Sequence, residues 1–167
     1  MSEFQLAADT HIGYARLRVA DLNRSLGFYR DQLGLTEIRR DGDTSYLSAD
    51  GSEPAIIILT EDPDAPPKPR RSTGLYHVAI RLPSRKALAE TFRQLVVKQV
   101  PFSGFSDHLV SEALYLPDPD DNGLELYRDR PREEWRMSNG AVAMDTLPLD
   151  LDDLLGEAGD EPYTGID

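Results

Sequence analysis

Two side chains in the second half of the sequence are of types that bind metal ions or move protons. His77 lies near the start of the stretch LYHVAIRLP, and Glu125 lies in the middle of GLELY. Both stretches alternate between apolar and polar residues, as β-strands do. A carboxylate between Leu124 and Leu126 either faces water or points into a pocket, and the strand alone does not decide. An imidazole and a carboxylate that meet in a pocket form a ligand-type pair.

An internal repeat places these two residues at related positions. The segment YARLRV aligns with HVAIRL, which makes Tyr14 the counterpart of His77. Further along, Ile56 becomes the counterpart of Glu125. If the two repeats pair and curve around one cleft, all four positions face that cleft.

Each repeat is expected to contain a strand, a helix and three more strands. In unit one, about 10–61, a strand over 14–19 precedes a helix that Asp21 caps. Its apolar stripe runs from Leu22 to Leu33, and Gly34 ends it. Three short strands follow, at about 35–40, 44–49 and 55–60.

Unit two, about 74–130, repeats this order after a polar, Pro-rich linker. A strand over 77–82 precedes a helix over 85–97 that Ser84 caps. Strand-like pieces follow near 102, at 112–116 and at 124–128. Because each unit is too small to bury its own sheet face, we expect the two to pair as one α+β domain over residues 1–140.

Composition excludes several classes of function. The chain of 167 residues lacks cysteine, which excludes disulfides, thiol nucleophiles and cysteine-based metal sites. A net charge of −12 argues against nucleic-acid binding, which needs a basic face. The sequence contains no apolar run long enough to cross a membrane, and its N-terminus does not read as a signal peptide. We therefore expect a cytoplasmic protein without nucleic-acid or membrane partners.

Much of the negative charge lies in the C-terminal segment 141–167. This segment has eight acidic residues and no lysine or arginine. Leu149, Leu151, Leu154 and Leu155 indicate one short amphipathic helix. The helix is expected to dock on its own domain, on a second domain or on a sister subunit.

The motifs RVADLNRSLGFYRDQLGL, GLYHVAIRLPSR and DHLVSEALYLPDPDDNGLELYRDRPREEW resemble the vicinal oxygen chelate superfamily. This superfamily contains glyoxalase I, bleomycin-resistance proteins and type I extradiol dioxygenases. The resemblance covers about residues 10–135. THIGYA, SDHLVSEALYL and PLDLDDLLGEAGDE are most similar to the N-terminal domain of two-domain, catechol-2,3-dioxygenase-like bacterial proteins. The chain is then either a single-domain relative or a piece of a two-domain protein.

The resemblance implies a fold and a metal. Paired βαβββ units would form an open, cup-shaped sheet around a divalent ion. In extradiol members, a facial triad of two histidines and a carboxylate holds Fe(II) and leaves positions for catecholate and dioxygen. By position, His77 and Glu125 match the second histidine and the carboxylate. Fe(II) is the ion expected, with Mn, Zn or Ni as alternatives and a metal-free cleft as another.

The first ligand position holds Tyr14, which is a poor ligand for Fe(II) near neutral pH because a phenol has a pKa of about 10. Three roles for Tyr14 stay open: third ligand, substrate contact, or filler of a vacated site. His11 lies three residues earlier, so in a regular strand it points to the opposite side.

The resemblance also suggests the acid–base groups. Extradiol enzymes place a histidine near the oxygen site on the stretch that holds His108 in this chain, and an imidazole can accept and return a catechol proton. Tyr115, on the following strand, could hydrogen-bond a substrate oxygen. For each of them, the alternative is an ordinary loop or core side chain.

The favoured hypothesis is an extradiol dioxygenase-type oxidoreductase, or a domain of one, that acts on a catechol-like aromatic diol. The rival is a module without catalysis, which binds a small aromatic molecule or supports a second, similar domain. Tyr14 favours the rival, and the pair of His77 and Glu125 favours the enzyme. A glyoxalase-type lyase is less favoured, because Ile56 occupies the place of a carboxylate that glyoxalase uses. A homodimer is also plausible.

Overall fold

The computed structural model describes residues 4–7, 9–66, 68–69 and 73–166. Both units adopt the βαβββ order predicted from the sequence. Unit one contains β1 (Ala15–Val19), α1 (Leu22–Tyr29), β2 (Thr36–Asp41), β3 (Thr44–Ser48) and β4 (Ile57–Glu61). Unit two contains β5 (Val78–Arg81), α2 (Arg85–Val97), β6 (Gly104–Asp107), β7 (Ser111–Pro117) and β8 (Gly123–Asp129).

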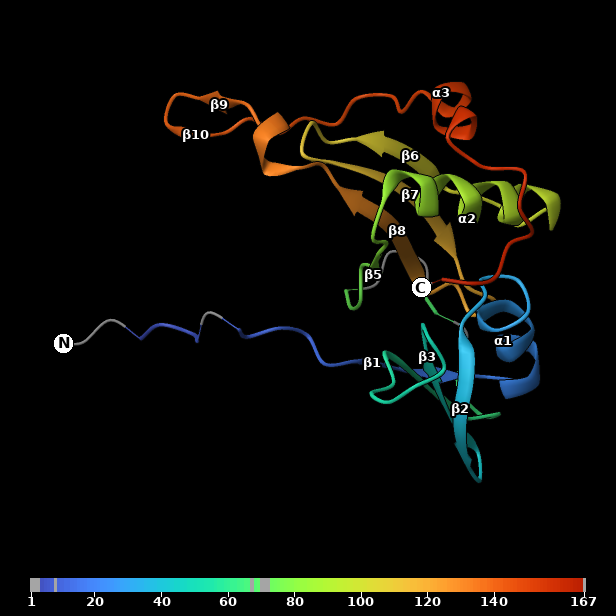
Figure 1. The fold of residues 1–167 in the computed structure, drawn as a ribbon. Helices are drawn as coiled ribbons and strands as arrows, with labels where there is room; N and C mark the ends of the chain where they lie inside the picture. The colour runs from blue at the N-terminus through green and yellow to red at the C-terminus, as the bar shows by residue number, and fades with distance from the viewer. Residues whose placement is uncertain (1–3, 8, 67, 70–72, 167) are drawn as a thin grey trace.

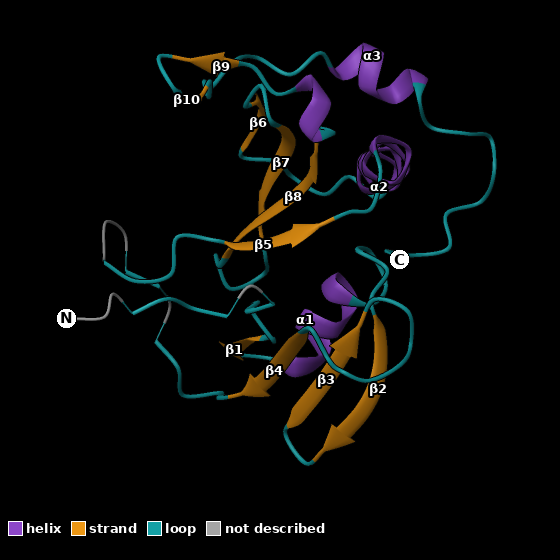
Figure 2. Cartoon of the chain, turned by 60° about the vertical axis from the view of Figure 1, so that its left-hand side comes forward, coloured by secondary structure: helices purple, strands orange, loops and turns teal. Residues whose placement is uncertain are grey.

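The two units have the same sheet topology. The strand order is β1-β4-β3-β2 in unit one and β5-β8-β7-β6 in unit two. In each sheet the first strand is parallel to the last one, and the remaining pairs are antiparallel. The sheets stay open, and Figure 2 separates the units, with β1–β4 and α1 below and β5–β8 and α2 above.

After unit two the chain forms smaller elements, which Figure 1 shows in orange and red. They are η1 (Arg132–Glu134), β9 (Met137–Ser138), β10 (Ala141–Val142) and α3 (Leu151–Gly156). No helix in the described part of the chain is long and apolar enough to span a membrane.

Both helices begin at the caps that the sequence predicts. The Asp21 carboxylate accepts from the N–H of Arg24, and the Ser84 hydroxyl accepts from the N–H of Ala87. The expectation that the first helix continues to Leu33 was wrong, because α1 ends at Tyr29. The chain then turns, and Gly34 takes a φ of +90°, which favours glycine. Leu33 is nevertheless fully buried. The apolar stripe therefore predicted a buried side chain at this position, although the helix ends before it.

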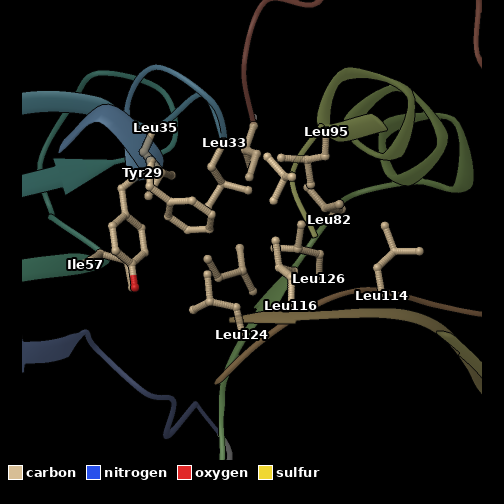
Figure 3. Close-up of a cluster of buried hydrophobic side chains, with 14 of the residues drawn as sticks. Tyr29, Leu33, Leu35, Ile57, Leu82, Leu95, Leu114, Leu116, Leu124 and Leu126 are labelled. Carbon is tan, nitrogen blue, oxygen red and sulfur yellow. The ribbon is translucent and has the colours of Figure 1, made fainter. Parts of the chain in front are cut away.

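The hydrophobic core joins the two units. Its buried side chains come from both helices and from both sheets, and Figure 3 shows those of unit one facing those of unit two. Leu33, Leu35 and Ile57 of unit one, like Leu95 and Leu126 of unit two, are at most 2% exposed. Each unit therefore covers an apolar surface that the other would otherwise expose to water.

A buried hydrogen bond reinforces this junction. The hydroxyl of Tyr29 on α1 donates to the carboxylate of Asp118, which lies in the turn between β7 and β8, at 2.9 Å. The second carboxylate oxygen accepts from the backbone N–H groups of Asp120 and Asn122. Burial, followed by the nearby Asp118 charge, raises the pKa of Tyr29 well above its usual value of 10.

Tyr29 should therefore make stability depend on pH in the alkaline range. Above about pH 10 the unfolded chain releases the Tyr29 proton, whereas the folded chain keeps it. The contribution is complete below that pH and is lost as the pH rises towards the folded pKa. We expect the unfolding free energy to fall less steeply with rising pH in Tyr29→Phe than in the wild type. The two slopes should differ by up to about 1.4 kcal/mol per pH unit. Urea unfolding between pH 8 and 11 measures the slopes, and equal slopes would contradict the prediction.

Candidate metal and proton-transfer site

The structure brings His77 and Glu125 together. His77 lies just before β5, and Glu125 lies in the centre of β8, where it pairs with Ala79. The His77 Nε2 atom lies 2.8 Å from Oε2 of Glu125. The two side chains are 26% and 14% exposed, so the contact is partly shielded from water.

Gly123, at the start of β8, permits this close approach. A Cβ atom at position 123 would lie 3.3 Å from the Cβ of His77 and would overlap the carbonyl oxygen of Tyr76. Only glycine leaves room there for the backbone that leads into β5. The sequence analysis did not single out Gly123, although a glycine at a strand start is a signal of close backbone approach.

Tyr115 and His108 extend the pair into a chain of four side chains. Tyr115 on β7 is directly opposite Glu125 in the antiparallel register. Its hydroxyl donates to Oε1 of Glu125 at 2.8 Å. His108, in the loop between β6 and β7, places Nε2 2.9 Å from the Tyr115 hydroxyl oxygen. Its Nδ1 atom lies 2.9 Å from the carbonyl oxygen of Asp145.

The hydrogen atoms along this chain can be counted. A carbonyl oxygen only accepts, so Nδ1 of His108 carries a hydrogen that it donates to Asp145. The contacts from His108 to Tyr115 and from Tyr115 to Glu125 each need one more hydrogen. Tyr115 supplies the hydrogen of the contact with Glu125. Nδ1 of His108 is thus the ring nitrogen that faces the backbone, and Nε2 is the one that faces the Tyr115 hydroxyl.

Tyr115 is suited to remain a neutral donor. Burial, followed by the hydrogen bond to Glu125 and the charge of that carboxylate, raises the pKa of Tyr115 well above the usual value for tyrosine. Its hydroxyl therefore keeps its proton at neutral pH and donates it to Glu125.

Three of these four side chains border a cavity of about 620 Å³ on unit two, and Glu125 lies behind them. His77, His108 and Tyr115 line it, together with Tyr76 and Thr146. The volume is in the range of small-molecule sites, and the lining is mostly apolar with a few convergent polar groups.

Tyr14 does not line this cavity, and its side chain is 59% exposed. Within the described residues, its hydroxyl has no hydrogen-bond partner. Ile56 packs against the hydrophobic core, and its side chain has no atom that can bind a metal ion. The His11 ring contacts the carbonyl oxygen of Asp9 rather than the site. Unit one therefore adds no side chain to the cavity.

Nε2 of His77 and Oε2 of Glu125 are placed so that both could bind one divalent ion. Two neighbouring ligand atoms, each about 2.1 Å from one metal, lie about 3 Å apart, close to the observed 2.8 Å between His77 and Glu125. No cluster of three or more His, Asp or Glu side chains with metal-binding geometry occurs in the described part of the chain. Bound water or substrate would have to fill the remaining positions.

Tyr115→Phe removes only the hydroxyl that Glu125 and His108 share. We expect the unfolding free energy to fall by about 1–3 kcal/mol, because both partners lose a hydrogen bond in a half-buried site. Tyr127→Phe is the matched control on β8, since the Tyr127 hydroxyl has no partner among the described residues; its effect should stay within about 0.5 kcal/mol. Urea unfolding compares the two variants, and equal losses would show that the shared hydroxyl does not stabilise the site.

The comparisons with known proteins agree with this fold. Residues 11–126 match the family model of the Glyoxalase/Bleomycin resistance protein/Dioxygenase superfamily. A glyoxalase/dioxygenase structure from Nostoc punctiforme superposes with a TM-score of 0.62 at 19% identity, over 78% of this chain and 100% of that one. A domain of the same superfamily from Frankia sp. EAN1pec has a TM-score of 0.59 at 22% identity, over 74% and 94%. At these identities, the structures support the fold alone.

A catechol-2,3-dioxygenase from Bacillus subtilis (strain 168) is 47% identical over 160 residues, which are 95% of this chain. The chain spans 55% of the length of that relative. The two βαβββ units, the family match and this identity lead to one conclusion: the chain belongs to the Glyoxalase/Bleomycin resistance protein/Dioxygenase superfamily.

Proposed function

We propose that this chain is an extradiol dioxygenase-type domain that acts on a catechol-like aromatic diol. The observation that carries the proposal is the chain of contacts from His77 through Glu125 and Tyr115 to His108, at the edge of one cavity. The 47% identity to a catechol-2,3-dioxygenase supports the same reaction class. Since that relative is nearly twice as long, the proposal concerns the domain.

His77 and Glu125 would hold a divalent ion, which superfamily membership and the similarity to a catechol-2,3-dioxygenase both imply. Fe(II) is the ion that suits this reaction, and it would supply Lewis-acid chemistry and open positions for a diol and dioxygen. For His77 to bind through Nε2, that nitrogen must carry no hydrogen, so the neutral ring would have its single hydrogen on Nδ1.

The other two side chains would handle protons. Tyr115 would orient the carboxylate of Glu125 through the bond to Oε1, as outer partners of ligands do. His108 lines the cavity, so its Nε2 atom can take a proton from a diol hydroxyl and return it later. Because the Tyr115 hydroxyl contacts His108 as well as Glu125, it would also help to hold Nε2 of His108 at the cavity.

A second candidate is a module that supports catalysis elsewhere or binds a small aromatic molecule without a metal. The exposed position of Tyr14 and the lack of a three-ligand cluster in the described residues favour it. In this case His77 and Glu125 form a hydrogen-bonded pair, and Tyr76, Tyr115 and Leu124 provide apolar walls.

Metal content separates the two candidates. Protein purified without chelator or a histidine tag should contain about one Fe, Mn, Zn or Ni ion per chain, measured by mass spectrometry. Glu125→Gln should lose at least about nine-tenths of it, because an amide is a far weaker ligand than a carboxylate. Glu161→Gln, which changes a carboxylate that is 81% exposed, should keep the ion. Metal absent from every sample, even after addition of each ion, would favour the second candidate.

Ring cleavage is the direct test of activity. With Fe(II) and air, wild-type protein should convert catechol or a substituted catechol into a yellow product, measured by absorbance. His77→Ala should abolish this activity, and His108→Gln should lower kcat by about 10²–10⁴-fold through loss of acid–base catalysis. His11→Gln, outside the site, should match the wild type. Iron-loaded protein that leaves several catechols unchanged would contradict the proposal.

A further inference from the structure

We infer that residues 145–147 of the acidic C-terminal segment are a built-in part of the site, and that they position the ring of His108. This inference deepens the proposed function and rests on it for the role of His108. Two observations support it. The Asp145 carbonyl oxygen lies 2.9 Å from Nδ1 of His108, and Thr146 lines the same cavity as His108.

A short pairing with the edge strand β6 fixes this segment. Asp107 and Leu147 form an antiparallel bridge in which each backbone N–H donates to the other carbonyl at 2.9 Å. Asp107 directly precedes His108, and Leu147 lies two residues after Asp145. The two bridge hydrogen bonds therefore hold the imidazole and its carbonyl acceptor in register.

The loop that carries His108 is held from the other side as well. Oδ1 of Asp107 accepts from the N–H of Leu109 at 2.8 Å, and its Oδ2 accepts from Arg130 at 2.8 Å. Leu109 has a φ of +68°, which is unfavourable for a side chain other than glycine. A loop held in a strained conformation by specific bonds fits a positioning role.

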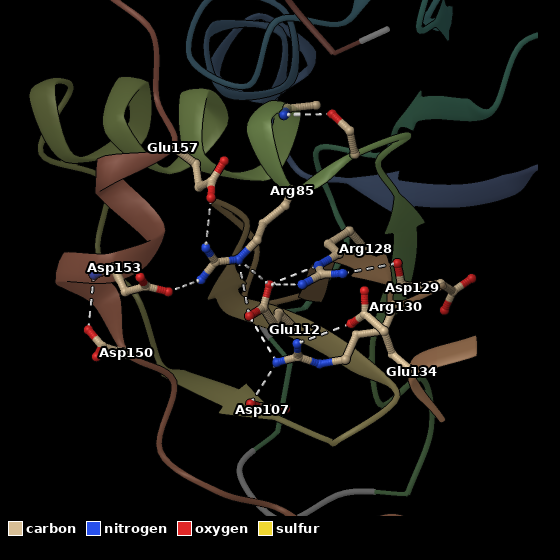
Figure 4. A network of polar contacts seen from close by, with 12 residues as sticks. Arg85, Asp107, Glu112, Arg128, Asp129, Arg130, Glu134, Asp150, Asp153 and Glu157 are labelled. Atoms are coloured by element: carbon tan, nitrogen blue, oxygen red, sulfur yellow. Dashed lines mark hydrogen bonds and ion pairs between the residues drawn. The ribbon is translucent and has the colours of Figure 1, made fainter. Parts of the chain in front are cut away.

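An ion cluster, drawn in Figure 4, anchors the next part of the segment. Glu112, which is 2% exposed, accepts hydrogen bonds from Arg85, Arg128 and Arg130. Arg85 also reaches α3, with contacts of 2.7 Å to Asp153 and 3.3 Å to Glu157.

Apolar contacts add to this anchor. Leu154 on α3 is fully buried, and Leu149 is 9% exposed. The acidic segment is thus anchored by packing and by charge a few residues beyond the point where it contacts His108.

The Asp145 carbonyl decides which nitrogen of His108 does the chemistry. It requires a hydrogen on Nδ1, so Nε2 is the atom that faces Tyr115 and exchanges a proton in the cavity. Without this acceptor the ring could rotate or change its tautomer, and Nε2 would lose its alignment. Backbone carbonyls play this orienting role for histidines in many sites.

The test removes one of the two bridge hydrogen bonds without changing His108. Leu147→Pro deletes the N–H that donates to Asp107, and the Leu147 side chain is already 40% exposed. Met144→Pro is the matched control in the same segment, because Met144 is 66% exposed and its N–H has no acceptor within the described residues.

The readout is the ¹⁵N NMR signature of the His108 ring in the iron-free full chain. The sequence contains three histidines, and His108→Gln identifies the signal. In wild type and Met144→Pro, Nδ1 should carry a hydrogen. In Leu147→Pro, the Nδ1 signal should shift towards that of a bare nitrogen. Unchanged signals in folded Leu147→Pro would overturn the inference.

A milder pair of changes covers the case in which Leu147→Pro does not fold. Asp153→Asn with Glu157→Gln removes the exposed partners of Arg85 and leaves the Glu112 contacts in place. We expect a smaller shift of the same Nδ1 signal and faster amide exchange at Leu147. If both quantities match the wild type, the segment does not depend on this anchor and the inference fails.

Activity then distinguishes the two proposals. If the domain cleaves catechols, Leu147→Pro should lower kcat by about 10- to 100-fold, with a smaller change in KM, as loss of an orienting partner does. If wild type shows no cleavage but the NMR shift occurs, the proposed function fails while the positioning role stands.

Discussion

The half-buried carboxylate of Glu125 sets the main constraint on unit two. A charge in the middle of a sheet is costly unless donors or a metal compensate it. Here His77 approaches one oxygen and Tyr115 donates to the other. The close approach of the chain before β5, the glycine at position 123 and the pairing of β7 with β8 all bring donors to this one group.

The two units share a fold and differ in chemistry. The counterparts of His77 and Glu125 in unit one are Tyr14, which is exposed, and Ile56, which packs against the core. Unit one instead supports unit two, through the common core and through the Tyr29 hydroxyl on Asp118.

The acidic segment after unit two combines two physical roles. Three arginines contact the buried carboxylate of Glu112, which by itself cannot balance their positive charge. Acidic side chains of the segment pair with one of them, Arg85. The backbone of the segment supplies an acceptor to His108 and a wall to the cavity. Part of the negative charge of segment 141–167 is thus paired with arginine in the structure.

Sequence by itself predicted the βαβββ order of both units and singled out His77 and Glu125, and the family resemblance added His108 and Tyr115. Helices and strands follow from local periodicity and caps, which is why Asp21 and Ser84 mark both helix starts. The alternation around Glu125 and the repeat were enough to connect it with His77.

Tertiary structure alone decided that Tyr115 bridges Glu125 and His108, and that Tyr14 stays outside the cavity. Only the structure revealed the contact between the Asp145 carbonyl and His108. A backbone carbonyl that contacts a ring 37 residues away leaves no pattern in the sequence of side chains. Local propensity fixes which residues lie on a strand, whereas the meeting of distant strands depends on packing and register.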